Sequence, residues 1–309
     1  MSTAKMTTYE QVGIKEDISD IITNISPTKT PFQSMIGGEG IHNTLHQWQE
    51  DSLNAVGTNA QIEGATAPSA VQNPTVMRTN NTQILSKVAS ASGTTDAVKT
   101  YGRSKELAYQ LSLRSAEIKR DLENAFVGAV QAAVVGNDTS TARQMASAQS
   151  MIDTTVTYVM GGGGGLGYTG SYPSTATISE TALLSVVQQL YIDGAEPNTL
   201  MIKPGDGTNV AAFQTNNRTK FVENGQKDVV NVVDVYESPF GKVKVVLNRF
   251  LNVSDALVFE PSMWKKLTLR NWFRETLAKT GDSTQVQIVG EFSLKHRNFK
   301  ASGRIANCT

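Results

Sequence analysis

A run of glycines at 161–167 is the first part of the chain whose residue types could support chemistry. It contains the G-x-G-x-x-G spacing of dinucleotide sites, in which a helix begins after the glycines and its N-terminus binds the pyrophosphate. The next stretch contains Pro173 and many hydroxyl residues, and Tyr168 stands where a P-loop has its lysine. We therefore predict a flexible glycine loop. A nucleotide-binding enzyme that uses residues 161–167 is the remote alternative.

Histidine and cysteine supply no convincing metal site or nucleophile. His42, His46 and Glu50 are spaced by four, which on a helix could bring three metal ligands together. The alternation around Trp48 instead predicts a strand, where each step of four spans about 13 Å. The only cysteine, Cys308, excludes a disulfide scaffold, and near a chain end without a histidine it is predicted to be a mobile, untuned thiol.

A cluster of basic and aromatic side chains near the C-terminus has two interpretations. Its members are Lys265, Lys266, Arg270 and Arg274 with Trp264, Trp272 and Phe273. They could bind nucleic acid through charge and base stacking, but a strand with inward apolar residues explains the pattern better. Because no catalytic constellation is present, we predict that the protein is not an enzyme and has no cofactor and no bound metal.

The N-terminal segment is predicted to be an arm that lies on another surface. Isoleucines at positions 14, 18, 21, 22 and 25 recur at helical spacing, which predicts a short amphipathic helix that Pro27 stops. Pro27 and Pro31 then favour an extended course through residues 28–30. The apolar stripe is narrow and needs a partner surface.

A projecting hairpin is predicted next. Strands are expected at 44–49 and 76–89, and the only charged residue between Ser52 and Met77 is Glu63. An extended hairpin cannot bury its faces alone, so it implies a neighbouring molecule.

The rest of the chain predicts an α+β fold. A long helix is expected from about 103 to 135, with an apolar stripe from Leu107 to Ala133. Thr177 to Glu180 fits a capping box for a helix that Gly194 closes. Strands are expected at 200–203, 229–236, 242–247, 256–260, 265–273 and 284–294, with a short helix at 209–214. Residues 137–177 are rich in Ser, Thr, Ala and Gly, with one short apolar stretch at 156–160.

Charge is balanced overall but divided along the chain. Residues 1–60 carry three basic and seven acidic side chains (−4), 61–130 carry eight and six (+2), 131–200 carry one and five (−4), and 201–309 carry sixteen and ten (+6). The acidic N-terminal segment and the basic C-terminal third could attract each other, within a chain or between neighbours. The start lacks the apolar stretch of a signal peptide and no run is long enough to span a bilayer, so we expect no membrane partner.

Several segments, in order along nearly the whole chain, resemble the tailed-phage major capsid proteins of the family named after phage SU ten. They are residues 14–22 (IKEDISDII), 24–32 (NISPTKTPF), 46–53 (HQWQEDSL), 106–110 (ELAYQ), 119–123 (KRDLE), 234–241 (DVYESPFG), 248–250 (NRF) and 277–282 (LAKTGD). The resemblance implies the Hong Kong 97-like capsid fold. It divides the chain into an N-terminal arm (1–40), an extended hairpin loop (41–95), a peripheral domain with spine helix and glycine-rich loop (96–177), an axial domain (178–262) and strands returning to the peripheral domain (263–309).

The implied function is structural. A major capsid protein would self-assemble, as hexamers and pentamers, into the icosahedral head of a tailed phage around double-stranded DNA, which it would contact non-specifically. Portal and scaffolding proteins, and a decoration protein, are the implied partners; assembly would take place in the host cytoplasm. The same fold leaves an encapsulin-like nanocompartment shell as an alternative. For packing between subunits we predict Ile18, Ile21, Phe32 and Trp48, and we expect deletion of 1–36 to leave a folded subunit that cannot form shells.

Overall fold

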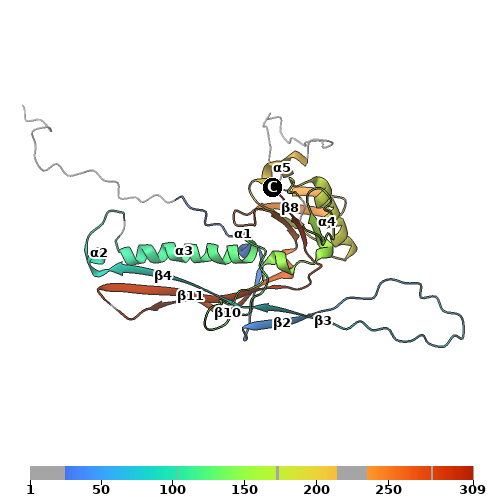
Figure 1. Cartoon of the computed structure of the whole chain (residues 1–309), viewed down its shortest axis with the longest axis horizontal. Helices are drawn as coiled ribbons and strands as arrows, with labels where there is room; N and C mark the ends of the chain where they lie inside the picture. The colour runs from blue at the N-terminus through green and yellow to red at the C-terminus, as the bar shows by residue number, and fades with distance from the viewer. Residues whose placement is uncertain (1–24, 103, 172–173, 214–234, 280, 309) are drawn as a thin grey trace, which may run out of the picture.

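The computed structural model describes residues 25–102, 104–171, 174–213, 235–279 and 281–308. They form a mixed α+β fold in which a compact part and an elongated part share one chain (Figure 1). The fold class predicted from the sequence is confirmed.

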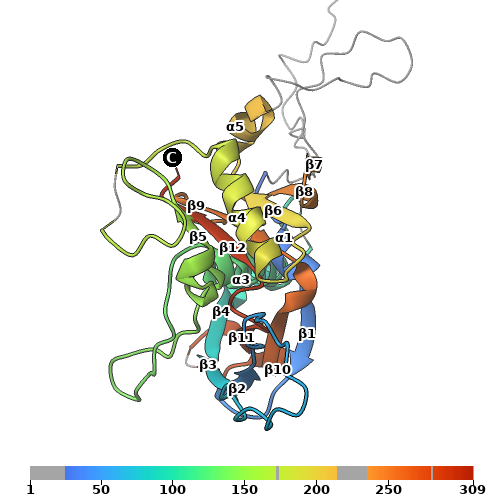
Figure 2. The ribbon, with the colours of Figure 1, turned by 90° about the vertical axis from the view of Figure 1, so that its right-hand side faces the viewer.

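The compact part is a six-stranded sheet covered by a helix. Its strand order is β5-β12-β9-β6-β8-β7, and α4 (Glu180–Ile192) packs on β12, as Figure 2 shows. The strands are β5 (Thr157–Val159), β6 (Thr199–Ile202), β7 (Val235–Ser238), β8 (Gly241–Leu247), β9 (Asp255–Phe259) and β12 (Gly303–Ala306), and α5 (Asp206–Ala212) follows β6. Strands β6, β9 and β12 are buried along their whole length, so this sheet is the centre of the core.

The elongated part is a four-stranded sheet beneath the long helix α3 (Glu106–Val127). Its order is β1-β10-β11-β4, from β1 (Gly37–Gly40), β10 (Trp264–Thr276), β11 (Ser283–His296) and β4 (Gln83–Ser92), and α2 (Gly93–Ala97) follows β4. A separate antiparallel ribbon pairs β2 (Leu45–Glu50) with β3 (Val76–Asn81). The connection between them, residues 51–75, extends beyond the rest of the molecule (Figure 1).

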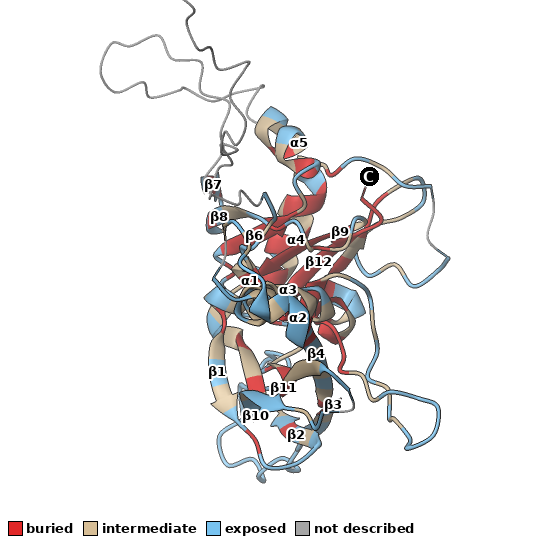
Figure 3. Cartoon of the chain, turned by 90° about the vertical axis from the view of Figure 1, so that its left-hand side faces the viewer, coloured by how far each residue is buried: buried red, intermediate tan, exposed pale blue. Residues whose placement is uncertain are grey.

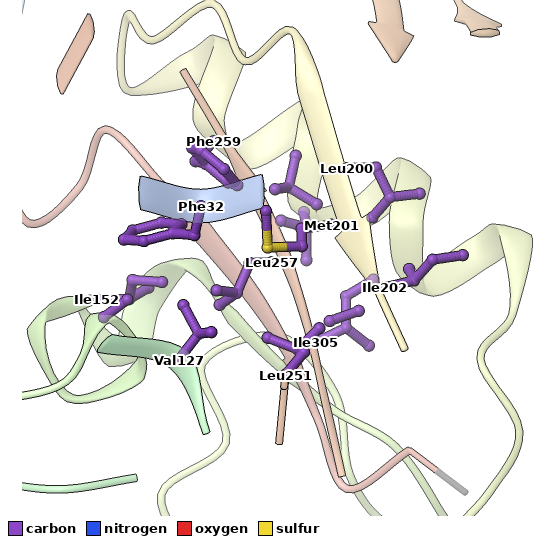
Figure 4. Close-up of a cluster of buried hydrophobic side chains, with 14 of the residues drawn as sticks. Phe32, Val127, Ile152, Leu200, Met201, Ile202, Leu251, Leu257, Phe259 and Ile305 are labelled. Carbon is purple, nitrogen blue, oxygen red and sulfur yellow. The ribbon is translucent and has the colours of Figure 1, made fainter. Parts of the chain in front are cut away.

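The two parts meet at an apolar core. Phe32 of α1 (Pro31–Met35) lies with Val127 from the end of α3 and with Leu257 and Phe259 of β9 (Figure 4). Buried residues concentrate in the six-stranded sheet, whereas the elongated part is largely half-buried or exposed (Figure 3). The compact part therefore supplies most of the apolar burial that stabilises a single subunit.

The long helix is shorter than predicted. It ends at Val127 with Gly128 as its C-cap, and the chain then turns into a small hairpin in which Val134 bridges Gln144. The alanines of the predicted stripe beyond Gly128 bury too little surface to continue the helix against this tertiary pairing.

The helix at 180–192 has a different cap from the one predicted. Ser179, not Thr177, is the N-cap, and its side chain accepts a hydrogen bond from the Ala182 N–H at 3.2 Å. Gly194 closes the helix with φ +87°, as its position after the last apolar residue predicts.

One strand prediction needs correction. The run predicted as one strand at 76–89 breaks at Thr82, because β3 pairs with β2 while β4 joins β11. Residues 263–309 contribute to both sheets, since β10 and β11 lie in the four-stranded sheet while β12 pairs with β9 and β5 in the six-stranded sheet. The predicted domain bounds stay predictions. The hairpin of β7 and β8 is confirmed; its predicted residues 229–234 lie outside the described part.

Candidate intersubunit surfaces

The ribbon of β2 and β3 is fixed by one carboxylate at the end from which residues 51–75 leave. Glu50 forms an ion pair with Arg78, 2.5 Å between Oε2 and Nε, and its other oxygen accepts the backbone N–H of Phe299. The Arg78 guanidinium lies 4.2 Å from the centre of the Phe299 ring. These contacts fix the direction in which the connection 51–75 leaves the body.

Trp48 belongs to a row of neighbouring rings inside its own subunit. Its ring centre is 5.8 Å from that of His46 and 6.4 Å from that of Phe299. Phe299 continues to His296 at 5.8 Å, and His296 lies flat on Trp264 at 3.9 Å. Since only 8 % of Trp48 is exposed, its packing within the chain joins the ribbon to the core. A role for Trp48 between subunits stays a prediction.

The crossing from β3 to β4 is held by a buried carboxylate, Glu291. Its Oε1 accepts the Thr82 hydroxyl at 2.7 Å and pairs with Arg143, and its Oε2 accepts Arg270 Nε at 3.0 Å. Arg143 Nε also donates to the Thr82 carbonyl at 2.7 Å. The side chain of Asn80, which is fully buried, donates a hydrogen bond to the Leu294 carbonyl and accepts one from the Ala146 N–H. This polar network fixes the point where the ribbon leaves the sheet.

The connection 51–75 is exposed to solvent, in contrast to the buried contacts at the ends of the ribbon. All of its residues are exposed, and four aliphatic side chains have almost no cover: Leu53 98 %, Val56 103 %, Ile62 84 % and Val71 74 %. Apolar groups presented on a projecting segment are typical of a surface that another protein covers.

The described beginning of the chain is anchored, not free. The carboxylate of Glu123, fully buried in α3, accepts the backbone N–H groups of Phe32 at 2.8 Å and Gln33 at 3.0 Å. It thereby satisfies the first amide groups of α1, and Asn248 donates to it at 2.8 Å. Burial raises the pKa of Glu123, and these hydrogen bonds oppose the rise.

Phe32 is buried within its own subunit, and a role for it between subunits stays a prediction. Its ring is 0 % exposed and lies 5.5 Å from the ring of Phe259, 5.8 Å from Trp264 and 6.0 Å from Phe126. The side chain is enclosed by its own subunit, so residues 31–40 fasten the predicted arm to the body of that subunit. Of the other predicted residues, Ile18 and Ile21 lie outside the described part.

Two buried groups in the core are held in unreactive forms. Burial lowers the pKa of His296 to about 3, and its ring nitrogens bond Ser302 at 2.9 Å and the Met151 carbonyl at 3.3 Å. Cys308 is 1 % exposed, contrary to the predicted mobile thiol. Burial, reinforced by nearby Asp206 and Asp255, raises its pKa to about 12, so the thiolate is disfavoured.

The glycine run is a turn that folds back on β5. Gly167 N–H donates to the Thr157 carbonyl at 2.9 Å and Val159 N–H to the Gly165 carbonyl at 2.9 Å, while Gly161 and Gly163 adopt positive φ. In the described part, the next helix is α4, beginning at Glu180. The helix N-terminus that dinucleotide binding requires is thus missing directly after the run, which removes the basis for the nucleotide-binding alternative.

The remaining candidates are used structurally. Glu50 of the predicted histidine set is bonded to Arg78, and the described ranges hold no group of three or more His, Cys, Asp or Glu placed to bind a metal. In the basic and aromatic cluster, Trp264 is buried and Trp272 packs against Phe292 at 4.5 Å. Among the described helices, none is long and apolar enough to cross a membrane.

Comparison with known proteins agrees with this architecture. The chain matches the SU10 major capsid protein family over residues 2–309. It is 32 % identical to the major capsid protein of Escherichia phage Phieco32, over 96 % of this chain and 94 % of that protein. The capsid of a native GTA particle superposes with a TM-score of 0.65 at 11 % identity, covering 98 % of both chains.

The fold extends to a cellular shell as well. The SrpI encapsulin of Synechococcus elongatus superposes with a TM-score of 0.57 at 10 % identity, covering 99 % of this chain and 96 % of the encapsulin. At such identities the likeness shows the Hong Kong 97-like fold alone, whereas the family match and the Phieco32 relative concern the sequence itself. The chain belongs to the SU10 major capsid protein family, and it is a structural component of a tailed-phage capsid.

Proposed function

We propose that copies of this chain close into the icosahedral head of a tailed phage, as hexamers and pentamers, around double-stranded DNA. The observation that carries the proposal is a contrast: the ribbon is fixed at its two ends by Glu50 and Glu291, whereas the connection 51–75 is fully exposed. A rigid base holds the connection away from its own subunit, where a neighbouring subunit can cover it.

The energy of assembly would come from many modest contacts. Covering one exposed Leu, Ile or Val side chain contributes about 1.5–3 kcal/mol before the costs of association. Leu53, Val56, Ile62 and Val71 are such side chains, and each subunit offers the same set to a neighbour. Because every contact is repeated around the shell, the individual contributions reinforce one another.

The proposal assigns a role in the shell to each segment of the chain. Residues 1–40 serve as the arm, 41–95 as the extended loop, 96–177 and 263–309 chiefly as the peripheral domain, and 178–262 as the axial domain. The anchoring of 31–40 at Glu123 supports an arm whose free part precedes α1. Ile18 and Ile21 of that free part would pack on a neighbouring subunit.

The other partners are those that a phage head requires. Portal and scaffolding proteins would direct closure in the host cytoplasm, a decoration protein would bind the finished shell, and DNA would be contacted non-specifically. The role proposed for the chain is structural, without a catalytic step, a cofactor or a membrane partner.

Electron microscopy of particles purified from the natural source tests the proposal. We expect closed icosahedral shells that contain double-stranded DNA protected from nuclease. Shells that hold protein cargo and no DNA would favour the encapsulin-like nanocompartment, and a chain that stays as free subunits would contradict both.

A further inference from the structure

A groove of about 230 Å³ opens between α3 and the paired strands β10 and β11. Ile118 of α3 and Ile288 of β11 form its floor, only 2 % and 4 % exposed. Its walls include Ser115, Trp272, Lys119 and Arg274. The volume has room for aliphatic side chains but not for a folded element, so a suitable occupant is a narrow apolar stripe.

The rim of this groove is cationic and unpaired. The acidic residues nearby on α3, Glu117 and Asp121, bind Lys87 of β4 at 3.6 and 3.0 Å. Lys119 and Arg274 have no ion-pair partner among the residues that the structure describes. Strand β1 pairs only with Lys265–Thr268 of β10, so the half of β10 that borders the groove has no neighbour on that edge in the described sheet. The groove is thus open beside two positive charges.

The N-terminal arm has the complementary pattern. Its isoleucines recur at helical spacing from Ile14 to Ile25, and residues 10–25 carry four acidic side chains and one basic, a net −3. Ile25, where the described chain begins, is 96 % exposed. An apolar stripe flanked by carboxylates matches an apolar floor flanked by an ammonium and a guanidinium.

Residues 25–30 of the same subunit lie away from this groove. Residues 25–30, blue in Figures 1 and 2, run to α1 on the side of α3 opposite to β10 and β11. Glu123 then holds α1 at that position. The occupant that fits is therefore the arm of another copy.

We infer that residues 14–25 of one subunit bind the groove between α3 and β10 of a neighbouring subunit. Ile18 and Ile21 lie on the floor formed by Ile118 and Ile288, and the arm's carboxylates face Lys119 and Arg274. This inference rests on the proposed function and names the surface that receives the arm.

Cross-linking between two single-site variants tests the inference. The only native cysteine, Cys308, is buried and its pKa is raised to about 12, so it gives little background reaction. Full-length Ile18→Cys is mixed with full-length Ser115→Cys, assembled, oxidised mildly and separated on a non-reducing gel. Ser86→Cys replaces Ser115→Cys in the control, because Lys87 faces α3 and its neighbour Ser86, also exposed, faces the other side of the sheet.

We expect a covalent dimer for the Ile18→Cys and Ser115→Cys pair and none for the control pair, since a disulfide forms only when the Cα atoms approach within about 7 Å. Shells that form without this dimer, or with equal dimer in the control, overturn the inference and leave the proposed function standing. A further sample uses one chain that carries both Ile18→Cys and Ser115→Cys. A link within that chain, with none between the two single-site variants, also overturns the inference, because the groove then holds its own arm. Failure of the wild-type chain to assemble contradicts the proposed function instead.

Discussion

Phe32 and Leu53 are both apolar residues from the first fifth of the chain, yet Phe32 is 0 % exposed and Leu53 is 98 % exposed. The surroundings of Phe32 are complete in one subunit, with three aromatic rings around it and a buried carboxylate that caps its helix. Leu53, in contrast, has almost no side chains packed around it in the subunit. Under the proposed function, the difference separates residues that fold the subunit from residues that join subunits, and each prediction below tests to which group a residue belongs.

Phe32→Ala should have the largest effect on the subunit. Removing a fully buried phenylalanine leaves a cavity at the junction of the two parts and costs about 3–5 kcal/mol of unfolding free energy. Urea unfolding of the unassembled subunit measures this loss, and Phe32→Leu should lose less. Unchanged stability with failed assembly would return Phe32 to the subunit interface.

Deletion of 1–36 removes Phe32 and α1 from the core and should therefore destabilise the subunit, whereas deletion of 1–24 leaves α1 in place.

Glu291→Gln should have the next largest effect. It removes the charge that pairs with Arg143 and Arg270 while keeping the size of the side chain, and we expect a loss of about 2–3 kcal/mol because the carboxylate is buried and its partners become unpaired. The matched control is Glu237→Gln, in an ion pair whose side chains are 73 % and 72 % exposed. That change should alter the unfolding free energy by less than about 1 kcal/mol. Equal losses in both variants would show that Glu291 does not hold the ribbon base.

Acid should weaken the core through His296. Its pKa is lowered to about 3 in the folded chain against 6.5 as the ordinary value, so below pH 6.5 the unfolded state binds the extra proton. The stability contributed by neutral His296 is complete above that pH and falls by up to about 1.4 kcal/mol per pH unit as the pH drops towards 3.

The comparison that isolates this effect is His296→Phe against wild type at several pH values from 7 to 5. The buried carboxyls of Glu123, Asp206 and Asp255 have raised pKa values; they act in the opposite direction and are present in both proteins. The free energy of unfolding of His296→Phe should rise relative to that of wild type as the pH falls. A gap independent of pH would contradict a buried neutral imidazole.

Regular elements with local signals were predictable from sequence. The isolated helix after Ser179, the hairpin of β7 and β8 and the long helix all carry spacing or turn residues that specify them. The projecting ribbon could be predicted because a long uncharged stretch separates two alternating runs.

What could not be predicted depends on distant partners. Strand β1 is Gly-Gly-Glu-Gly, which has little strand propensity and pairs because β10 lies beside it. Strand β12 is buried on both faces and shows no alternation. Glu123 caps α1 across 91 positions of sequence, and Glu291 bonds Thr82 across 209. Only Pro31, at the first turn of α1, is a local signal for the helix that was missed.

The central claim is that the connection 51–75 joins subunits and does not stabilise the subunit itself. The most direct test compares the double variant Leu53→Asp with Val56→Asp against the conservative pair Leu53→Met with Val56→Ile. Both should unfold within about 0.5 kcal/mol of wild type, because the sites are exposed. Electron microscopy should then show closed shells for the conservative variant and only free subunits for the aspartate variant; closed shells from the aspartate variant would contradict the account.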